Sequence, residues 1–226
     1  MNLLRELWVV TAKDLRIEAR SRVTIGQVLP FGVVVLLLFA FALDPDRGIL
    51  PRVAPGLFWV AVLLAALLAV SRGFAIEEAN GARDGLRLSG LDTGAMFLGK
   101  ALAIAIQLIV LEVVLGVGVV IFYDITPRAA EVLLPAALAA TVGLAAAGTL
   151  YGVLAAGLRV RETLLPLLLL PVVAPVMLGA TRAFEAGLGL SGSPGEAWPW
   201  VEMLGLFALI YTTLGFLAFG PLLEEA

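Results

Sequence analysis

Residues 132–158 read VLLPAALAATVGLAAAGTLYGVLAAGL, a run of 27 residues without a charged side chain. A helix that crosses the hydrocarbon core of a membrane needs about 20 apolar residues, so this run is long enough. A membrane β-strand would alternate apolar and polar residues over about 10 positions, whereas this run is apolar on every side. Because a helix also closes its own backbone hydrogen bonds without water, we predict a transmembrane helix here.

Five further stretches have the same character, and among them only 101–123 contains a charged residue, Glu112. They are residues 23–43, 53–71, 101–123, 163–181 and 203–223. With 61% hydrophobic and 15% charged residues, a water-soluble fold would lack the polar surface that keeps it dispersed. We therefore predict an all-α integral membrane protein whose residues 23–226 form a single domain of six transmembrane helices.

The lysines and arginines are distributed unequally over the segments between these stretches. Eleven of the fifteen fall in residues 1–22 and in the loops after the second and fourth stretches, and four fall in the other loops. Basic residues accumulate on the cytoplasmic side of membrane proteins. The distribution predicts a multi-pass protein with both termini in the cytoplasm.

Residues 1–22 have the pattern of an amphipathic helix. One face holds Leu4, Leu7, Trp8, Thr11 and Leu15. The other face holds Arg5, Lys13 and Arg16. A helix of this kind lies in the membrane interface, where tryptophan is common; the alternative is a cytoplasmic helix packed on a partner. We favour the interfacial helix because of Trp8 and the flanking bases.

Cysteine and histidine are both absent, which argues against disulfides, iron–sulfur clusters and histidine metal sites. We expect no metal site and no enzymatic activity.

Two glycine patterns could suggest nucleotide binding. Residues 94–101 match the phosphate-loop spacing except that Ala101 replaces the hydroxyl residue, and residues 187–192 fit the dinucleotide pattern but lie in an outer loop without a preceding strand. We expect membrane lipid, and no nucleic acid, around the chain.

The cytoplasmic loop at residues 72–100 mixes acids, bases and spaced apolar residues. Its apolar residues have no soluble domain of this chain to pack against, so the loop is a candidate docking element for a cytoplasmic partner. The alternative is a solvated connector. The candidate docking residues are Phe74, Glu77, Glu78, Gly81, Arg83, Asp84 and Leu88.

Glu112 lies near the middle of the third predicted helix. A carboxylate at that depth costs about 2.5 to 3.5 kcal/mol on insertion scales, so its side chain should face protein or water. It is either part of a substrate or proton path or a buried hydrogen-bonding group, with Gln107 or a hydroxyl of the fourth helix as its partner.

Two other patterns concern helix packing. Gly148, Gly152 and Ala156 give the fourth helix a small-residue face, which is either a homodimer contact or an internal one. Pro166, Pro171 and Pro175 predict a bend in the fifth helix.

Several motifs resemble those of the CcmB haem-exporter family. The run Ala54-Pro55-Gly56-Leu57-Phe58-Trp59 opens the second helix, and KDLR at 13–16 precedes the first. LSGL at 88–91 is followed by GKAL at 99–102, and Leu170-Pro171 lies in the fifth helix with Pro175. In the loop, Ser89-Gly90-Leu91 departs from the family, where many members carry a proline, and Glu112 has no expected counterpart.

The resemblance implies the permease subunit of an ABC-type complex in cytochrome c maturation, with an ABC-2-like exporter fold in a bacterial inner membrane. It implies an elbow helix at residues 1–22, with Trp8, Lys13, Asp14 and Arg16, and a coupling element in loop 72–100. The implied partners are a cytoplasmic ATPase subunit, a second copy, a tryptophan-rich haem-handling membrane protein, a small membrane subunit and a haem chaperone. Haem would be the cargo of the complex, with no cofactor bound by this chain.

Two other functions stay open at this point. The first is an ABC exporter permease for a drug, lipid or polysaccharide. The second is a proton-coupled secondary transporter that works through Glu112.

Overall fold

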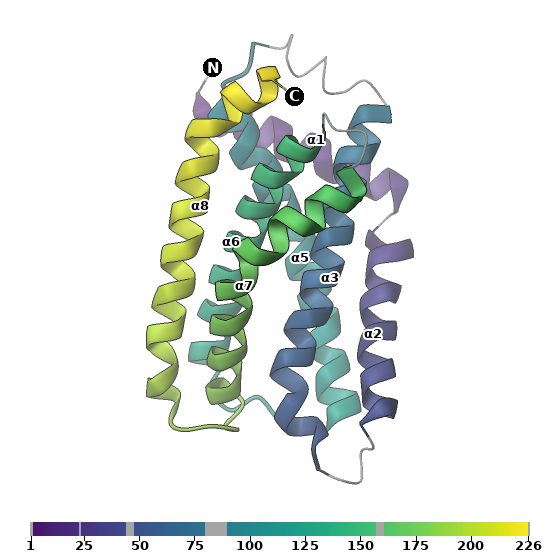
Figure 1. Ribbon diagram of the computed structural model, residues 1–226, viewed down its shortest axis with the longest axis vertical. Helices are drawn as coiled ribbons and strands as arrows, with labels where there is room; N and C mark the ends of the chain where they lie inside the picture. Colours follow the sequence, from purple (N-terminus) through teal and green to yellow (C-terminus); the bar gives the residue numbers. More distant parts are fainter. Residues whose placement is uncertain (1, 23, 44–47, 80–89, 157–160, 226) are drawn as a thin grey trace.

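A computed structural model describes residues 2–22, 24–43, 48–79, 90–156 and 161–225 (Figure 1). Across these ranges the chain is almost entirely helical and contains no strand. The helices are α1 (Leu3–Ser21), the π-helix η1 (Thr24–Val28), α2 (Leu29–Ala42), α3 (Leu50–Ala79), α5 (Thr93–Tyr123), α6 (Ala130–Ala156), α7 (Arg161–Gly187), the 3-10 helix η3 (Pro194–Ala197) and α8 (Trp198–Glu225).

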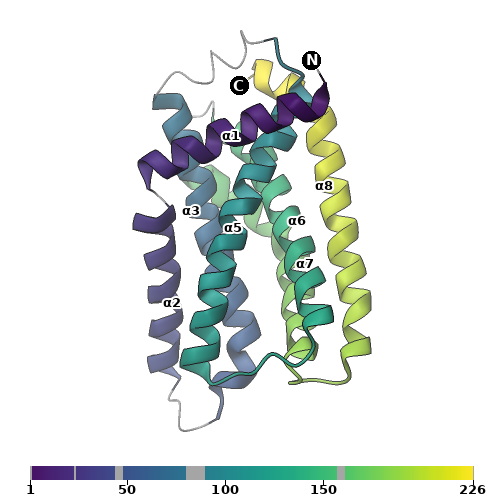
Figure 2. The same cartoon turned by 180° about the vertical axis from the view of Figure 1, so that it is seen from behind.

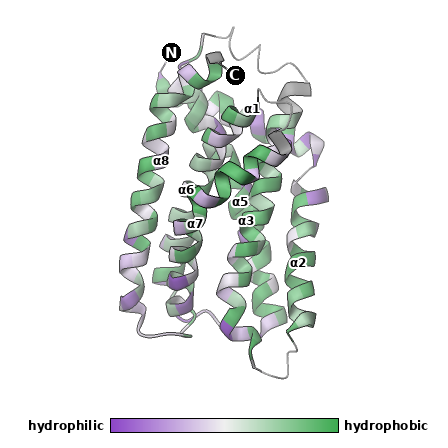
Figure 3. Ribbon diagram, viewed as in Figure 1, coloured by the Kyte–Doolittle hydropathy of each residue, from purple (hydrophilic) through white to green (hydrophobic). Residues whose placement is uncertain are grey.

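Six helical segments of the described chain are long and apolar enough to cross a membrane. They are η1 with α2, then α3, α5, α6, α7, and η3 with α8. The predicted all-α fold with six spans is confirmed. Figure 3 shows apolar residues along the middle of these helices and hydrophilic residues gathered toward their ends.

Two of the spans extend into the segment 72–100 that the sequence suggested to be a loop. Helix α3 continues to Ala79, and α5 begins at Thr93. The start of α5 is fixed by Asp92, whose side chain accepts a hydrogen bond from the backbone N–H of Ala95 at 2.9 Å, as N-cap residues do. Residues 94–101 are therefore the first turns of a helix and not a phosphate-binding loop.

The spans form a bundle, and α1 lies across one end of it. Figure 2 shows α1 running nearly at right angles to the spans, over α3 and α5 and toward α8. The start of α1 and the end of α8 lie at this same end (Figure 1), called the terminal end below. The links from α5 to α6 and from α7 to α8 lie at the opposite end, called the far end.

The helices pack through glycines that receive large side chains from their neighbours. A Cβ at Gly215 of α8 would lie 2.0 Å from the ring of Phe97 on α5, and one at Gly94 of α5 would lie 2.3 Å from the ring of Phe216 on α8. Small residues allow this close approach between helices in lipid. The two helices are thus interlocked in both directions.

The small-residue face of α6 makes an internal contact. A Cβ at Gly148 would lie 2.9 Å from Val70, and one at Gly152 would lie 2.3 Å from the ring of Phe74. Both partners belong to α3. The structure therefore favours the internal contact over the homodimer contact for this face.

Helix α7 changes direction part-way along its length in Figure 1. It carries Pro166, Pro171 and Pro175. Each proline removes a backbone N–H donor and clashes with the preceding turn, so the prolines account for the change of direction. The predicted bend in the fifth span is confirmed.

Replacing Gly215 by valine should weaken the contact between α5 and α8. The new side chain would collide with the Phe97 ring, and overpacking of this kind costs about 1–3 kcal/mol. We expect the G215V protein to lose its fold at a lower temperature than the wild type in mild detergent. The control is G205V in the same helix, because a Cβ at Gly205 meets no atom within 4 Å. Equal melting temperatures for the two variants would contradict the interlocked packing.

Candidate functional site

Helix α1 packs on α5 through a face that includes polar side chains. Glu6, Val10 and Thr11 are buried, whereas Trp8 is 61% exposed. Within the face predicted from the sequence, Leu4 and Trp8 are therefore exposed and Trp8 can meet lipid, whereas Thr11 is turned toward α5. The elbow residue Arg16 is also exposed.

Two hydrogen bonds fix α1 to the start of α5. A side-chain oxygen of Glu6 accepts a hydrogen bond from the backbone N–H of Asp92 at 2.8 Å. The hydroxyl of Thr11 lies 3.1 Å from the carbonyl oxygen of Gly99, to which it donates. A Cβ at Gly99 would lie 2.7 Å from Val10, so these bonds depend on the glycine.

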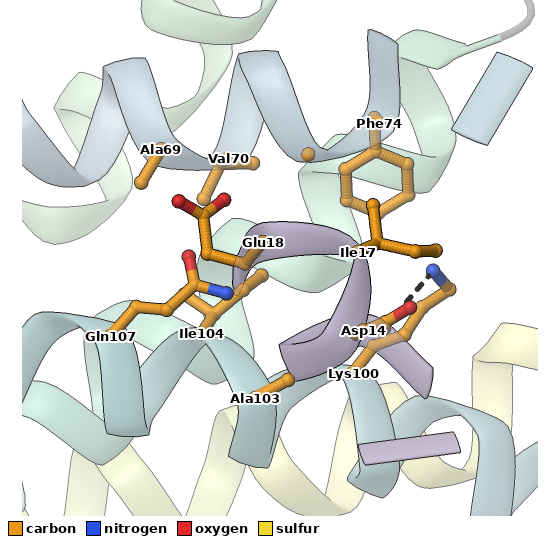
Figure 4. Close-up of a pocket in the computed structure, with 11 residues that line it drawn as sticks. Asp14, Ile17, Glu18, Ala69, Val70, Phe74, Lys100, Ala103, Ile104 and Gln107 are labelled. Carbon is orange, nitrogen blue, oxygen red and sulfur yellow. Dashed lines mark ion pairs between the residues drawn. The ribbon is translucent and has the colours of Figure 1, made fainter. Parts of the chain in front are cut away.

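A third contact joins α1 and α5 to the end of α3. Lys100 Nζ lies 3.6 Å from Asp14 Oδ2 and 5.2 Å from the centre of the Phe74 ring. Lys100 is only 7% exposed, and Asp14 is also paired with Lys13 at 2.8 Å. The close-up in Figure 4 shows Asp14, Lys100 and Phe74 together. We call these three residues the junction.

The junction borders a small crevice of about 50 Å³ between α1, α3 and α5 (Figure 4). Its other polar side chains are Glu18 and Gln107, which point toward one another in Figure 4. Glu18 also accepts a hydrogen bond from the backbone N–H of Thr24, where η1 begins. The crevice therefore connects α1, the start of the first span, and the terminal ends of α3 and α5.

The predicted coupling residues are only partly described. Phe74 is turned into the bundle, where it meets Lys100 and Gly152, and so it packs on its own chain. Glu77 and Glu78 lie in the last turn of α3, and their side chains are outside the described residues. Gly81, Arg83, Asp84 and Leu88 also lie outside them. The coupling role of these residues stays a prediction.

Lys100 and Glu18 were not among the candidate residues chosen from the sequence. The lining of the crevice nevertheless follows helical spacing: residues 14, 17 and 18 on α1; 69, 70, 73 and 74 on α3; and 100, 103, 104 and 107 on α5. Residues three, four and seven apart share one face of a helix. This spacing could have indicated that polar residues of three helices meet.

Glu112 bridges α5 and α6 in the middle of the bundle. Its Oε1 lies 2.6 Å from the hydroxyl oxygen of Thr141, which also lies 2.7 Å from the carbonyl oxygen of Ala137. Both Glu112 and Thr141 are buried. Of the two partners suggested by the sequence, the hydroxyl of the fourth span is confirmed. Gln107 lies instead on the crevice with Glu18.

A larger cavity of about 260 Å³ lies between α3, α5, α6 and α7 and extends toward the far end. Its lining includes Ala54 and Pro55 of the motif that opens α3, and Glu112 is the one ionisable residue among the residues that line it. We call it the far cavity. The structure thus brings the motif and the intramembrane carboxyl group to one place.

Aromatic side chains form one wall of the far cavity. Phe58 and Phe184, which line it, are stacked with ring centres 5.3 Å apart. Trp59 packs edge-on against both and is almost fully buried. Gly56, the remaining residue of the motif, faces Thr181 of α7. The motif at 54–59 therefore joins α3 to α7 beside the cavity.

Comparison with known proteins gives a consistent result over the whole chain. The family model described as CcmB protein matches residues 5–225. The chain belongs to the CcmB family. The match covers α1 to α8, so the junction and the far cavity both lie within the part of the chain shared with the CcmB family.

Individual relatives in this family are similar over most of their length. Heme exporter protein B of Paracoccus denitrificans is 30% identical over 210 residues, which is 92% of each chain. The protein of the same name from Pseudomonas aeruginosa is 29% identical over 204 residues, 90% of this chain and 91% of the relative. That of Rhodobacter capsulatus is 33% identical over 177 residues, 78% and 81% of the two chains.

Replacing Lys100 by methionine should loosen α1. Removing the charge breaks the ion pair between α5 and Asp14 and leaves Asp14 paired with Lys13 on its own helix, so the link between α1 and α5 is weakened. We expect a glutamate-specific protease, which cuts after Glu6 and Glu18, to cut within α1 several times faster in K100M than in the wild type. The matched control is K13M, because the ion pair of Lys13 with Asp14 lies within α1.

The double variant D14N/K100M then tests the pairing. If the two side chains act together, its cleavage rate should be lower than the single effects would give when combined. Effects that simply multiply would contradict the junction.

The bridge between Glu112 and Thr141 can be tested with two conservative changes. T141V removes the hydroxyl and should lower the stability by about 1 kcal/mol, the order found for hydrogen bonds between membrane helices. E112Q should keep the stability close to that of the wild type, because an amide still reaches Thr141 with a donor and an acceptor. The measurement is the midpoint of denaturation in mild detergent. A loss in E112Q equal to that in T141V would count against this bridge.

Proposed function

We propose that this chain is the membrane permease subunit of an ABC-type haem exporter complex. The observation that carries the proposal is the CcmB family match over residues 5–225, together with relatives named heme exporter protein B that align over most of their length. The six spans support a membrane role. Haem is the substrate of the complex in this proposal, and it is handled at the far end.

The proposal places ATP hydrolysis in a separate cytoplasmic subunit. The terminal end would face the cytoplasm of a bacterial cell, with the inner membrane around the spans. Loop 72–92 would receive the movement of the ATPase, and the junction would pass it to α1 and α5. Support for this direction comes from the excess of lysine and arginine in the segments at the terminal end and from the contact of Phe74 with Lys100.

The other proposed partners are a second copy of the chain, a tryptophan-rich haem-handling membrane protein, a small membrane subunit and a haem chaperone. Trp198 and Trp200 begin α8 at the far end, where a membrane partner could contact them. Tryptophan is also common at this depth for lipid contact alone. Co-purification of a haem-binding membrane protein would favour this assembly over an exporter of a drug, lipid or polysaccharide.

Mild-detergent purification of the full chain, followed by mass spectrometry, tests the proposal. We expect an ATPase subunit to co-purify with the wild type. Reversing both charges in E78R/R83E should reduce the ATPase recovered at least tenfold, because the loop would then present the opposite charges to its partner. A matched control is R182E/E185R, which exchanges the two members of an ion pair of 2.9 Å on α7, toward its far end.

Two outcomes would contradict the proposal. Unchanged recovery of the ATPase in E78R/R83E would remove the loop from the docking site. Haem-independent substrate uptake by the purified chain alone, in vesicles without any ATPase, would support a secondary transporter instead. Glu112 would then have to act in proton transfer, and E112Q would abolish uptake.

A further inference from the structure

The far cavity opens sideways between α5 and α6. Five of the residues that line it are exposed on these helices: Ile109, Val113 and Val120 on α5, and Leu134 and Leu138 on α6. Both helices are membrane spans, so these exposed side chains face hydrocarbon and not water. Figure 2 shows α5 and α6 spreading apart toward the far end. The entrance of the cavity therefore leads into the lipid.

The depth of the cavity matches one leaflet of the membrane. From Glu112 to the end of α5 at Tyr123 the helix rises about 16 Å, at 1.5 Å per residue. This is close to half of the hydrocarbon core of about 30 Å. Glu112 and Thr141 join α5 to α6 at the inner end of this distance, and Ile125 and Pro127 line the outer end.

The lining offers few groups that could bind a polar occupant. All of the lining residues except Glu112 are apolar or glycine, and one Glu112 oxygen already meets Thr141. Apolar cavities do not hold ordered water, because a buried water needs two to four polar partners, but they do take up apolar guests. In a bilayer, the apolar guest present at high concentration beside the entrance is the lipid tail.

Gly116 leaves the space beside α5 open within the cavity. It lies within α5 and lines the cavity, and a Cβ built there meets no atom within 4 Å. By contrast, many other glycines of the bundle receive a neighbouring side chain. Glycine inside a helix costs about 1 kcal/mol relative to alanine, and at this position no protein atom fills the space beside it.

Charged residues of both signs lie at the outer end of the cavity, where Asp124, Arg128 and Glu131 are exposed. Arg128 follows the lining residue Pro127, and its side chain is exposed. This end lies at the depth of the lipid head groups, where an arginine can bind a phosphate. Arg128 can thus meet a phospholipid head group while the apolar lining receives its chain, directed inward.

We infer that the far cavity binds one acyl chain of a phospholipid from the leaflet at the far end, with the chain between α5 and α6 and its methyl end near Glu112. The lipid would act as a filling element that supports α5 and α6 where they diverge. This inference does not depend on haem or on an ATPase partner.

Trp59 offers a direct test, because it packs against Phe58 and Phe184 of the cavity wall and is almost fully buried. The protein would carry phenylalanine at Trp8, Trp198 and Trp200, so that Trp59 is the one fluorescent indole. It would be placed in phospholipid nanodiscs whose acyl chains are brominated near the methyl end. Bromine quenches indole fluorescence at short range, so a chain in the cavity should reduce the emission.

The variant G116L fills the cavity and should lose at least half of this quenching. Its matched control is G205L, which makes the same change within α8. Gly205 is exposed, does not line the cavity, and has no atom within 4 Å of a Cβ built there. G205L should be quenched as strongly as the parent protein. Melting temperatures of both variants confirm that the fold is kept, and A137L offers a second cavity-filling change if G116L fails to fold.

Three results would overturn the inference. Equal quenching in G116L and G205L would show that the cavity is not where the chain lies. Quenching by aqueous iodide that G116L removes would show a water-filled cavity. Protection of Trp59 from brominated lipid in the parent and in G116L alike would indicate that protein, such as a helix of a second copy, covers the entrance.

Discussion

The bundle depends on the close approach of helices at glycines. Lipid tails are as apolar as the helices, so the hydrophobic effect does not drive helices together inside a membrane, and van der Waals packing takes its place. Phe97 and Phe216 each enter the space beside a glycine of the opposite helix. Val10 on α1 and Phe74 on α3 do the same at Gly99 and Gly152. The hydrogen bond from Thr11 to Gly99 lies at one of these contacts.

The junction and the pair of Glu112 and Thr141 lie at two depths, and their chemistry differs with depth. At the terminal end, full charges meet in the junction of Asp14, Lys100 and Phe74, where water and head groups are close. In the middle of the bundle, the observed contact is a single hydrogen bond between Glu112 and Thr141. A charge costs more at the bilayer centre than near its surface, which explains why the ion pair with Lys100 lies at the end of α5. The two sites therefore suit different tasks: one joins elements that could move, and the other holds α5 and α6 together.

The sequence predicted the fold well because its signal was simple. A long uncharged run such as residues 132–158 is stable in a membrane as a helix, so the number and type of spans could be predicted directly. The ends of the helices were less predictable, since Asp92 caps α5 several residues before the apolar stretch at 101–123 begins. A cap depends on one side chain meeting a backbone N–H, which hydrophobicity does not report.

The sites were harder to predict because they depend on which helix faces meet. Asp14 was among the candidates for its place in a motif, but its partner Lys100 lies 86 positions away in another motif, and neither motif indicated that the two side chains meet. Phe74 was expected to face a partner protein, yet Gly152 receives it within the chain. For Glu112, the sequence suggested Gln107 and a hydroxyl of the fourth span equally, and only the rotation of α5 separates them. Glycine contacts with α1 and α8 set that rotation. Each of these contacts joins residues that lie far apart in the sequence, so it cannot be recognised from one stretch alone.

The length of α3 has a mechanical consequence. This one helix runs from Leu50 to Ala79 and carries Phe58 at the wall of the far cavity and Phe74 at the junction. The 16 residues between them span about 24 Å of continuous helix, which behaves as a stiff lever. A tilt imposed at its Phe74 end would displace the Phe58 ring on the other side of the membrane without any change of backbone conformation in between. Events on opposite faces of the bilayer can thus be linked by one rigid rod and not by a chain of side-chain rearrangements.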